Sequence, residues 1–383
     1  MERGKIGIAT VYTGYNYGSS LQAYATKMIL RNMGYEGELL KLDGSLIPGR
    51  DVRPGKLLIT ALRSLIHTGS LKTLKNYRQS MSKELPEESV KKFGEFTRDA
   101  LSPRLISGGA LKKAAHSQEY KAFVCGSDQI WNSEVFYVDP FYYLRFAPVN
   151  KRIAFAPSFG RDFVPEYNKK TIARYVSDIP CKSVREISGA GLIRELTGSD
   201  AQVLLDPTLV MSADEWTHSL GMAEKGGGEK YLLAYFLDKP SRKAEETVLA
   251  IARKFGLKIV GLPYRFENCP WENAAGAGPK EFVEYIRNAS AVCTDSFHGT
   301  AFSLNFNVPF CTFNRNYGNA GEQSARIRSI LELTGMTARY EPESIDECMT
   351  LDFQHVNAVL TQEREKAHAY LNAALHGEEN GRG

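Results

Sequence analysis

The sequence lacks several features that mark large classes of proteins. No apolar run approaches the length of about 20 residues that a membrane-spanning helix needs. The six cysteines include no C-x-x-C pair and no grouping with histidine of the kind that binds zinc. A net charge of +4 over 383 residues is too slight to indicate a nucleic-acid partner. We therefore expect a globular protein with no metal site and no nucleic-acid partner.

The cysteines are scattered, and several lie inside short apolar runs that are typical of buried strands. Such positions favour free thiols over disulfides, and free thiols indicate a reducing compartment. The first residues lead directly into a strand-like run, residues 6–11, without the pattern of a signal peptide. The expected location is therefore the cytoplasm. The cysteines are Cys125, Cys181, Cys269, Cys293, Cys311 and Cys348.

The length of the chain exceeds that of one ordinary core, so two domains are expected. Short apolar runs end repeatedly in polar turns and are separated by helical stretches. This rhythm predicts parallel sheets with functional groups along one edge. We predict one domain over residues 1–209, with a helical insertion at about 47–111, and a second over 210–352. Residues 353–383 are expected to form a long helix and a disordered end.

The polar turn at residues 294–300 reads Thr-Asp-Ser-Phe-His-Gly-Thr. It follows a strand predicted at 289–293 and precedes a helix predicted from 301, which is where open α/β sheets bind ligands. We expect Asp295 and His298 to point at a ligand, Gly299 to allow close approach of the backbone, and the first helix amides to hold an anion. The alternative is that His298 is a core histidine bonded to backbone groups.

Two further turns carry candidate residues. The loop at residues 12–20 is rich in glycine and tyrosine, and such a loop at a helix start can hold a phosphate or a sugar ring, although it is neither G-x-G-x-x-G nor a P-loop. The turn at 126–132 follows a strand, and there Asp128 can accept a proton or bind hydroxyls. Trp131 in the same turn offers a flat face for a sugar. Loop packing around the tyrosines and core packing of Trp131 are the alternatives.

The helical insertion begins with a basic segment. Between residues 50 and 78 the only acid is Asp51. An apolar face made by Leu57, Leu58, Leu62, Leu65 and Ile66 runs among the basic residues. The segment is either a solvated helix packed on its domain or a contact with an anionic membrane surface or a lipid-linked substrate. The basic residues are Arg50, Arg53, Lys56, Arg63, Lys72, Lys75 and Arg78.

Taken together, the turns resemble those of the polysaccharide pyruvyl transferase family. The resemblance keeps the family's order of motifs from residue 6 to about residue 336. Each motif is short, but six in order are specific. The matching pieces are Asn-Tyr-Gly at 16–18 with Leu-Gln-Ala-Tyr-Ala at 21–25, residues 126–132, Ala-Pro-Ser-Phe-Gly at 156–160, Ser-Val-Arg-Glu at 183–186, Asp-Pro-Thr-Leu at 206–209, and residues 294–300.

The resemblance implies an α/β fold with two Rossmann-like domains facing across a cleft, similar to the GT-B glycosyltransferases. It implies transfer of a pyruvyl group from phosphoenolpyruvate, a co-substrate, to two hydroxyls of one sugar in a polysaccharide or its lipid-linked precursor. The products are a cyclic ketal and phosphate, and no further cofactor is implied. The donor carries a carboxylate and a phosphate, which suits clamping by Arg185 and Arg326. His298 fits a general acid, and Asp128, Glu186 or Asp295 fits a base.

The sequence departs from some relatives at one position. Ser296 stands where they have the arginine of Arg-Leu-His-Gly, so the donor phosphate must be held by Ser296, Thr300, helix amides including that of Gly299, or another arginine. On the acceptor side the resemblance points to Asn16, Tyr17, Gln129 and Trp131. Two other functions stay open: a GT-B glycosyltransferase using a nucleotide sugar, and a carbohydrate-binding protein without catalysis. No signature for a base and ribose pocket is found, and the set of Asp295, His298 and Arg185 favours an enzyme.

Overall fold

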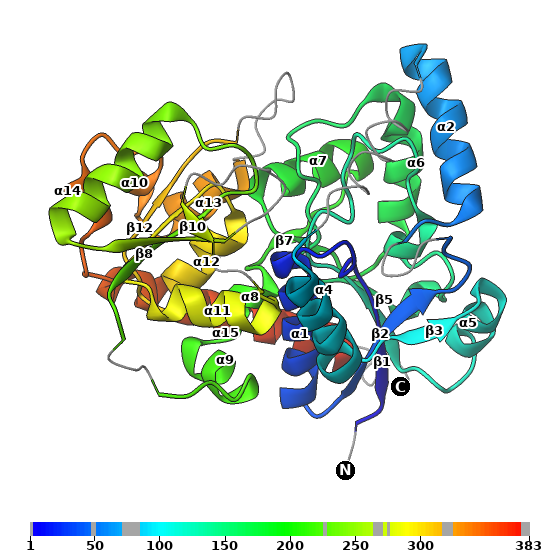
Figure 1. Ribbon diagram of the computed structural model, residues 1–383. Coiled ribbons are helices and arrows are strands. Elements are labelled where there is room, and N and C mark those ends of the chain that lie inside the picture. Colours follow the sequence, from blue (N-terminus) through cyan, green and yellow to red (C-terminus); the bar gives the residue numbers. More distant parts are fainter. Residues whose placement is uncertain are drawn as a thin grey trace. The chain divides into compact units, whose positions relative to one another are not determined.

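The computed structural model describes residues 3–46, 51–70, 85–224, 228–262, 271–273, 276–315 and 325–376 (Figure 1). The chain forms two compact units. The first contains residues 1–84, 97–207 and 366–383, and the second contains 85–96 and 208–365. Each unit is built around a parallel sheet, and each is described separately below.

The first unit contains a five-stranded sheet in the order β3-β2-β1-β4-β5, with every neighbouring pair parallel. This is the strand order of a Rossmann fold. The central strands are buried on both faces because helices cover a parallel sheet from both sides, and this explains their unbroken apolar runs. The strands are β1 (Lys5–Ala9), β2 (Glu36–Leu42), β3 (Arg104–Ile106), β4 (Ala122–Cys125) and β5 (Arg152–Ala154), with a small parallel pair β6 (Ser183–Val184) and β7 (Gln202–Val203).

The helices of the first unit follow the strands in the alternation that the sequence predicts. Helix α1 begins after Asn16, whose side chain caps it by accepting a hydrogen bond from the Ser19 amide at 3.1 Å. The helical segments are α1 (Tyr17–Asn32), α2 (Pro54–Thr68), η1 (Thr97–Leu101), α5 (Gly108–Ala115), η2 (Pro140–Tyr143), η3 (Val149–Lys151), α6 (Glu166–Ser177) and α7 (Ile187–Thr197).

The second unit repeats the same topology. Its sheet has the order β10-β9-β8-β11-β12, and every neighbouring pair is again parallel. When the strands are numbered within each unit, this strand order is the same as that of the first sheet. The prediction of an α/β fold with two Rossmann-like domains is confirmed by these two sheets. The strands are β8 (Tyr231–Tyr235), β9 (Lys258–Leu262), β10 (Glu272–Asn273), β11 (Ala291–Thr294) and β12 (Phe310–Thr312).

Helices cover the second sheet and continue to the end of the described chain. They are α4 (Glu87–Phe96), α9 (Ala213–Ser219), α10 (Arg242–Phe255), α11 (Pro279–Asn288), α12 (Phe297–Asn305), α13 (Ala325–Leu333), η4 (Thr337–Arg339) and α14 (Ile345–Cys348). Two helices cross the division between the units: α8 (Pro207–Val210) and α15 (Gln354–His376).

The division of the chain differs from the predicted boundaries in two places. Residues 85–96, inside the insertion expected in the first domain, belong to the second unit, where Lys92 pairs with Glu281 at 3.4 Å. The tail is not a separate element, because α15 contributes to both units. Arg364 of this helix belongs to the second unit and donates to the Leu209 carbonyl at 2.9 Å, whereas Tyr370 of the same helix belongs to the first unit. The expected disordered end, residues 377–383, lies outside the described residues.

The expectation of free cysteines is wrong for one pair. Cys311 in β12 and Cys348 in α14 form a disulfide across 37 residues of sequence, with their Cα atoms 5.3 Å apart. Spacing along the chain gave no sign of this pair because the fold of the second unit brings them together. Cysteine usage therefore no longer supports a reducing compartment. Cys125, Cys181 and Cys293 are free, and Cys269 lies outside the described residues.

Candidate active site

Each sheet has one position where the strand order reverses, and open α/β sheets bind ligands there, beyond the carboxyl ends of the strands. In the first unit the reversal lies between β1 and β4, so the loops at residues 10–16 and 126–132 flank it. In the second unit it lies between β8 and β11, flanked by residues 236–241 and 295–296. The polar turns predicted at 126–132 and 294–300 follow these strands directly.

The turn after β4 is fixed by its glycine and by side chains from α1 and from the loop after β1. Gly126 has a φ of +121°, and a Cβ there would lie 2.1 Å from the Phe155 carbonyl oxygen, so only glycine fits. The Ser127 amide donates to Gln22 Oε1 at 2.9 Å, and the Thr10 hydroxyl donates to the Ser127 carbonyl at 3.2 Å. These bonds hold the two loops at the reversal point together.

Asp128 sits in this turn with its carboxylate already bonded. The Ser19 hydroxyl donates to Oδ2 at 2.5 Å, and the Gln129 amide donates to Oδ1 at 2.8 Å. The Arg185 guanidinium lies 3.8 Å from Oδ1. The side chain of Asp128 keeps 13% of its surface exposed, whereas that of Arg185 keeps 3%. A substrate can therefore reach Asp128 more readily than Arg185.

Arg185 is the centre of a buried cluster of acids. It forms an ion pair with Asp206, whose side chain is fully buried and also accepts the Ser127 hydroxyl at 2.8 Å. Burial opposes the charged guanidinium, but Asp206, Asp128 and Glu186 outweigh that effect and raise the pKa of Arg185. Arg185 is therefore not part of an exposed surface ion pair. Three carboxylates, those of Asp206, Asp128 and Glu186, act on the single guanidinium of Arg185. This excess of negative charge disfavours binding of the highly anionic phosphoenolpyruvate at this point.

In the second unit the helix after β11 begins earlier than predicted. Helix α12 starts at Phe297 rather than 301, so His298 lies in its first turn and not in a loop. Ser296 is the N-cap and accepts the Gly299 amide at 3.4 Å. A Cβ at Gly299 would lie 2.6 Å from Thr294 Oγ1, so the small size of glycine is needed for packing against Thr294, and approach of the backbone to a ligand stays a prediction. His298 is 7% exposed.

Asp295 joins the two loops at the reversal point of the second sheet. Its two carboxylate oxygens accept the Leu237 amide at 2.6 Å and the Asp238 amide at 3.1 Å. Burial raises the pKa of Asp295 to about 7, although Arg315 and these two bonds oppose the shift. The carboxylate is thus engaged by the backbone after β8.

Two arginines of the second unit accompany this turn. The Arg326 guanidinium lies over the Phe297 ring, 5.9 Å from its centroid, and so stays beside the first turn of α12. Arg315 is close enough to Asp295 to act on its pKa. Sequence reasoning named Arg326 but missed Arg315. A signal for Arg315 was present in the sequence, because it closely follows the apolar run of β12, and strand ends carry the functional groups of such sheets.

Three predicted binding residues are not available to a ligand in this structure. Trp131 is fully buried, stacks on Tyr143 with 5.1 Å between ring centroids, and donates its indole N–H to the Tyr142 carbonyl at 3.0 Å. The expected sugar platform is therefore not met, and core packing holds instead. Tyr17 is buried in α1. Thr300 is also fully buried, and its hydroxyl donates to the Ser296 carbonyl at 3.0 Å.

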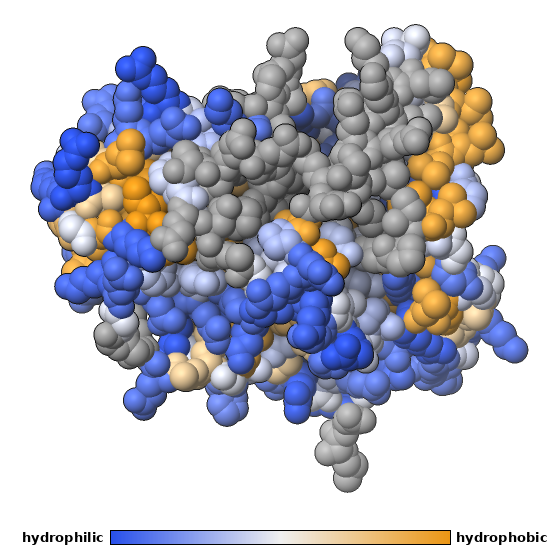
Figure 2. Space-filling view, in the orientation of Figure 1, coloured by the Kyte–Doolittle hydropathy of each residue, from blue (hydrophilic) through white to orange (hydrophobic). Residues whose placement is uncertain are grey.

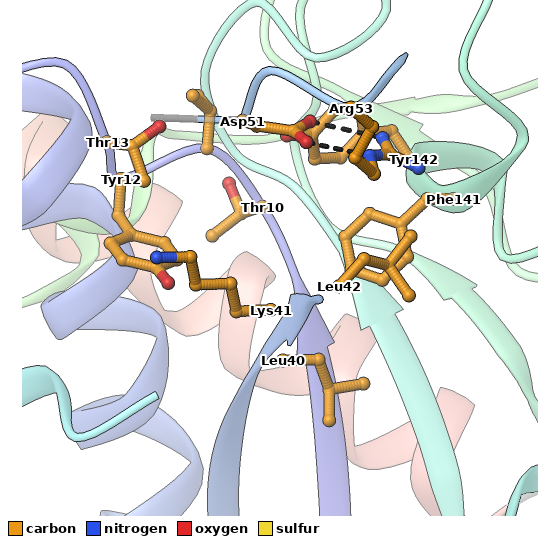
Figure 3. A pocket seen from close by; sticks show the side chains of 11 residues that line it. Thr10, Tyr12, Thr13, Leu40, Lys41, Leu42, Asp51, Arg53, Phe141 and Tyr142 are labelled. Carbon is orange, nitrogen blue, oxygen red and sulfur yellow. Dashed lines mark hydrogen bonds and ion pairs between the residues drawn. The ribbon is translucent and has the colours of Figure 1, made fainter. Parts of the chain in front are cut away.

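Two cavities are lined by described residues, one in each unit. In the first unit a pocket between the ends of β1 and β2 is lined by Tyr12, Asp51 and Arg53, with Arg53 Nε 2.7 Å from Asp51 Oδ1 (Figure 3). Its space of about 20 Å³ suits a single water molecule and no sugar ring. A cavity of about 720 Å³ in the second unit lies at the amino end of β8, the opposite edge from Asp295. Among the described residues, no cluster of His, Cys, Asp or Glu suits a metal ion.

The pKa of Asp295 leads to a pH-dependent stability. A group whose pKa is about 7 when folded and 3.8 ordinarily holds its proton more tightly in the folded state. Its contribution to the free energy of unfolding is full below pH 3.8 and is lost as pH rises towards 7, with a slope of up to ~1.4 kcal/mol per pH unit. We expect Asp295→Asn to remove this slope. Denaturant unfolding of both proteins between pH 4 and 8 measures it, and parallel curves would contradict the raised pKa.

Comparison with known proteins places these features in a family. A family model described as polysaccharide pyruvyl transferase matches residues 16–317. A search of curated proteins found no significant match. Among solved structures, a trehalose 6-phosphate synthase from Burkholderia multivorans is similar at 9% identity, with both chains fully covered and a TM-score of 0.48. A UDP-GlcNAc 2-epimerase from Neisseria meningitidis is similar at 9% identity, with 98% of this chain and 94% of that chain covered and a TM-score of 0.45. Because the family model spans most of its length, the chain belongs to the polysaccharide pyruvyl transferase family.

Proposed function

We propose that the protein transfers the pyruvyl group of phosphoenolpyruvate to two hydroxyls of one sugar in a polysaccharide or its lipid-linked precursor. Membership of the family supports the reaction class. The observation that carries the proposal is the turn after β11, where a buried carboxyl with a pKa near 7 and a histidine share the reversal point of a sheet. Groups that titrate near neutrality at such a point suit proton transfer.

The reaction has a simple proton balance. The methylene carbon of the donor gains a proton, and C2 then accepts the oxygen of one hydroxyl. The bond between C2 and the phosphate oxygen breaks, and phosphate leaves. The oxygen of the second hydroxyl then bonds to C2 and closes the ketal. Two protons leave the hydroxyls, while one goes to the donor carbon and one to phosphate. His298 is assigned to deliver a proton to the donor, and Asp295 and Asp128 are the candidate acceptors of hydroxyl protons.

The donor is assigned to the second unit. Phosphoenolpyruvate carries a phosphate and a carboxylate, and planar guanidinium groups bind both well. Arg326 beside α12 and Arg315 near Asp295 bring two positive charges to this turn. These arginines supply the positive charge that the neutral side chain of Ser296 lacks. The Ser296 hydroxyl is also occupied in capping α12. Gly299 is assigned a role through its small size, which allows the backbone to approach the donor closely.

The acceptor sugar is assigned to the reversal point of the first unit. Asp128, Gln129 and Asn16 lie on the two loops there and retain exposed surface. Arg185 acts as a positioning residue in this proposal, since it holds Asp206 and lies beside Asp128. This role replaces the donor clamp that we expected of Arg185.

The test compares donors and acceptors directly. The protein is incubated with phosphoenolpyruvate alone, with phosphoenolpyruvate and candidate glycans, and with UDP-sugars and the same glycans. We expect phosphate release that depends on a glycan, together with a new ketal methyl signal in the NMR spectrum of the glycan. Sugar transfer from a UDP-sugar without use of phosphoenolpyruvate would identify a glycosyltransferase and overturn the proposal.

A further inference from the structure

Helix α2 turns its apolar side away from the first unit. Five large side chains at positions i, i+1, i+4, i+7 and i+8 form one face, and each is between 40 and 74% exposed. In Figure 1 the helix stands at the margin of the molecule, and Figure 2 shows an apolar patch in the same place. We call these five residues the α2 face. They are Leu58, Ile59, Leu62, Leu65 and Ile66.

The opposite side of the helix holds it to the protein through polar contacts. Ser64 is fully buried, and Arg63 donates to the Tyr167 carbonyl at 2.7 Å and to Asn168 Oδ1 at 3.1 Å. His67 stacks on the Tyr167 ring with 4.6 Å between centroids. Rotating the helix to bury the α2 face would break these contacts. The orientation is therefore opposite to that of an ordinary surface helix, whose apolar stripe packs on the core.

The net positive charge of the segment that contains α2 points to an anionic surface. Arg63 bonds to two uncharged oxygens, so no acid neutralises it in those contacts. By sequence, residues 50–78 contain seven lysines and arginines against one acid, and of the described cations Arg53 and Lys56 pair with Asp51 and Asp139. Symmetric pairing of two copies through α2 would bring these like charges together. An apolar face within a basic segment instead matches a bilayer with anionic headgroups.

We propose that α2 lies in the interface of an anionic lipid bilayer, with the α2 face among the outer acyl segments and the net positive charge of its segment attracting it to the headgroups. The association is peripheral. In the part of the chain that the structure describes, no helix is both long and apolar enough to cross a membrane. This inference goes beyond the proposed reaction and does not rest on it, because it concerns only the surface of α2.

The experiment measures binding of the full chain to vesicles by sedimentation, without donor or acceptor. Wild type should bind vesicles of phosphatidylcholine with phosphatidylglycerol and not vesicles of phosphatidylcholine alone. Leu62→Asp/Ile66→Asp should lower the partition coefficient by about 100-fold. The control is Leu249→Asp/Leu351→Asp in the second unit, which alters side chains of equal exposure: 50 and 75% against 53 and 74%. It should bind like wild type.

Three results would overturn the proposal. The first is equal loss of binding in the control, and the second is absence of wild-type binding to anionic vesicles. The third is a dimer in sedimentation velocity that the Leu62→Asp/Ile66→Asp variant converts to a monomer, since the α2 face would then be an interface between copies. Raising the salt from about 0.1 to 1 M should weaken the wild-type binding, because the screening length falls from ~10 to ~3 Å. Binding that salt leaves unchanged would contradict the electrostatic part.

Discussion

Replacement of His298 by alanine is expected to lower turnover by about 10²- to 10⁴-fold, the usual contribution of a general acid. The imidazole is nearly buried in the first turn of α12, next in sequence to Phe297, on whose ring Arg326 lies. In the proposed reaction it supplies the proton that makes C2 of the donor electrophilic. His298→Asn retains a hydrogen-bonding group but cannot transfer a proton at neutral pH, so it should be similarly slow. Steady-state kinetics and the melting temperature of each variant give the measurement.

A matched control lies in the same helix. Ser303 is fully buried in α12, and its hydroxyl donates to the Gly299 carbonyl at 2.8 Å. Ser303→Ala therefore removes a buried polar group without touching the proposed proton path, and its turnover should stay near that of wild type. Retention of most activity by His298→Asn would show that His298 binds substrate and that the acid lies elsewhere. A large fall in melting temperature with normal specific activity would make it structural.

The second large effect concerns stability. Asp206→Ala should lower the free energy of unfolding of the first unit by about 3 to 5 kcal/mol, because it leaves the guanidinium of Arg185 buried without its ion-pair partner. It also removes the acceptor of the Ser127 hydroxyl and so loosens the turn that carries Asp128. Hydrogen exchange of the β1 and β4 amides reports the unfolding of this unit by itself.

Two comparisons separate the buried charge from a general effect of substitution. Arg185→Met/Asp206→Ala removes both charges and should regain part of the lost stability. Asp200→Ala breaks the pair between Arg194 and Asp200, whose side chains are 73 and 77% exposed, and should cost less than ~1 kcal/mol. Equal losses from Asp206→Ala and Asp200→Ala would show that the buried pair contributes no more than an exposed one.

The sequence predicted the sheets well because fully buried parallel strands leave unbroken apolar runs, such as residues 122–125. It also located the turns that flank the reversal points, since polar residues follow those strands directly. The start of α12 was misplaced by four residues, although the signal was in the sequence. Ser296 is a favoured N-cap, and a helix beginning after it places His298 in the first turn.

Other features depend on contacts between residues far apart in the chain. Nothing near Trp131 distinguishes a sugar platform from a core side chain, and only the packing of Tyr143 and Phe159 against it decides the matter. The partner of Arg185 is Asp206 rather than the adjacent Glu186, and a separation of 21 residues hides that choice. The same holds for the disulfide between Cys311 and Cys348.

The end of α15 has a consequence for how the protein is made. Ala367, Leu371 and Leu375 are buried in the first unit, and the Tyr370 hydroxyl donates to the carbonyl of Ala154 in β5 at 2.7 Å. A ribosome synthesises the five strands of that unit long before it reaches these residues. Domains usually fold during synthesis from the N-terminus onward. Here the strands of the first unit emerge before α15, so the apolar surface near β5 stays uncovered until α15 has been synthesised.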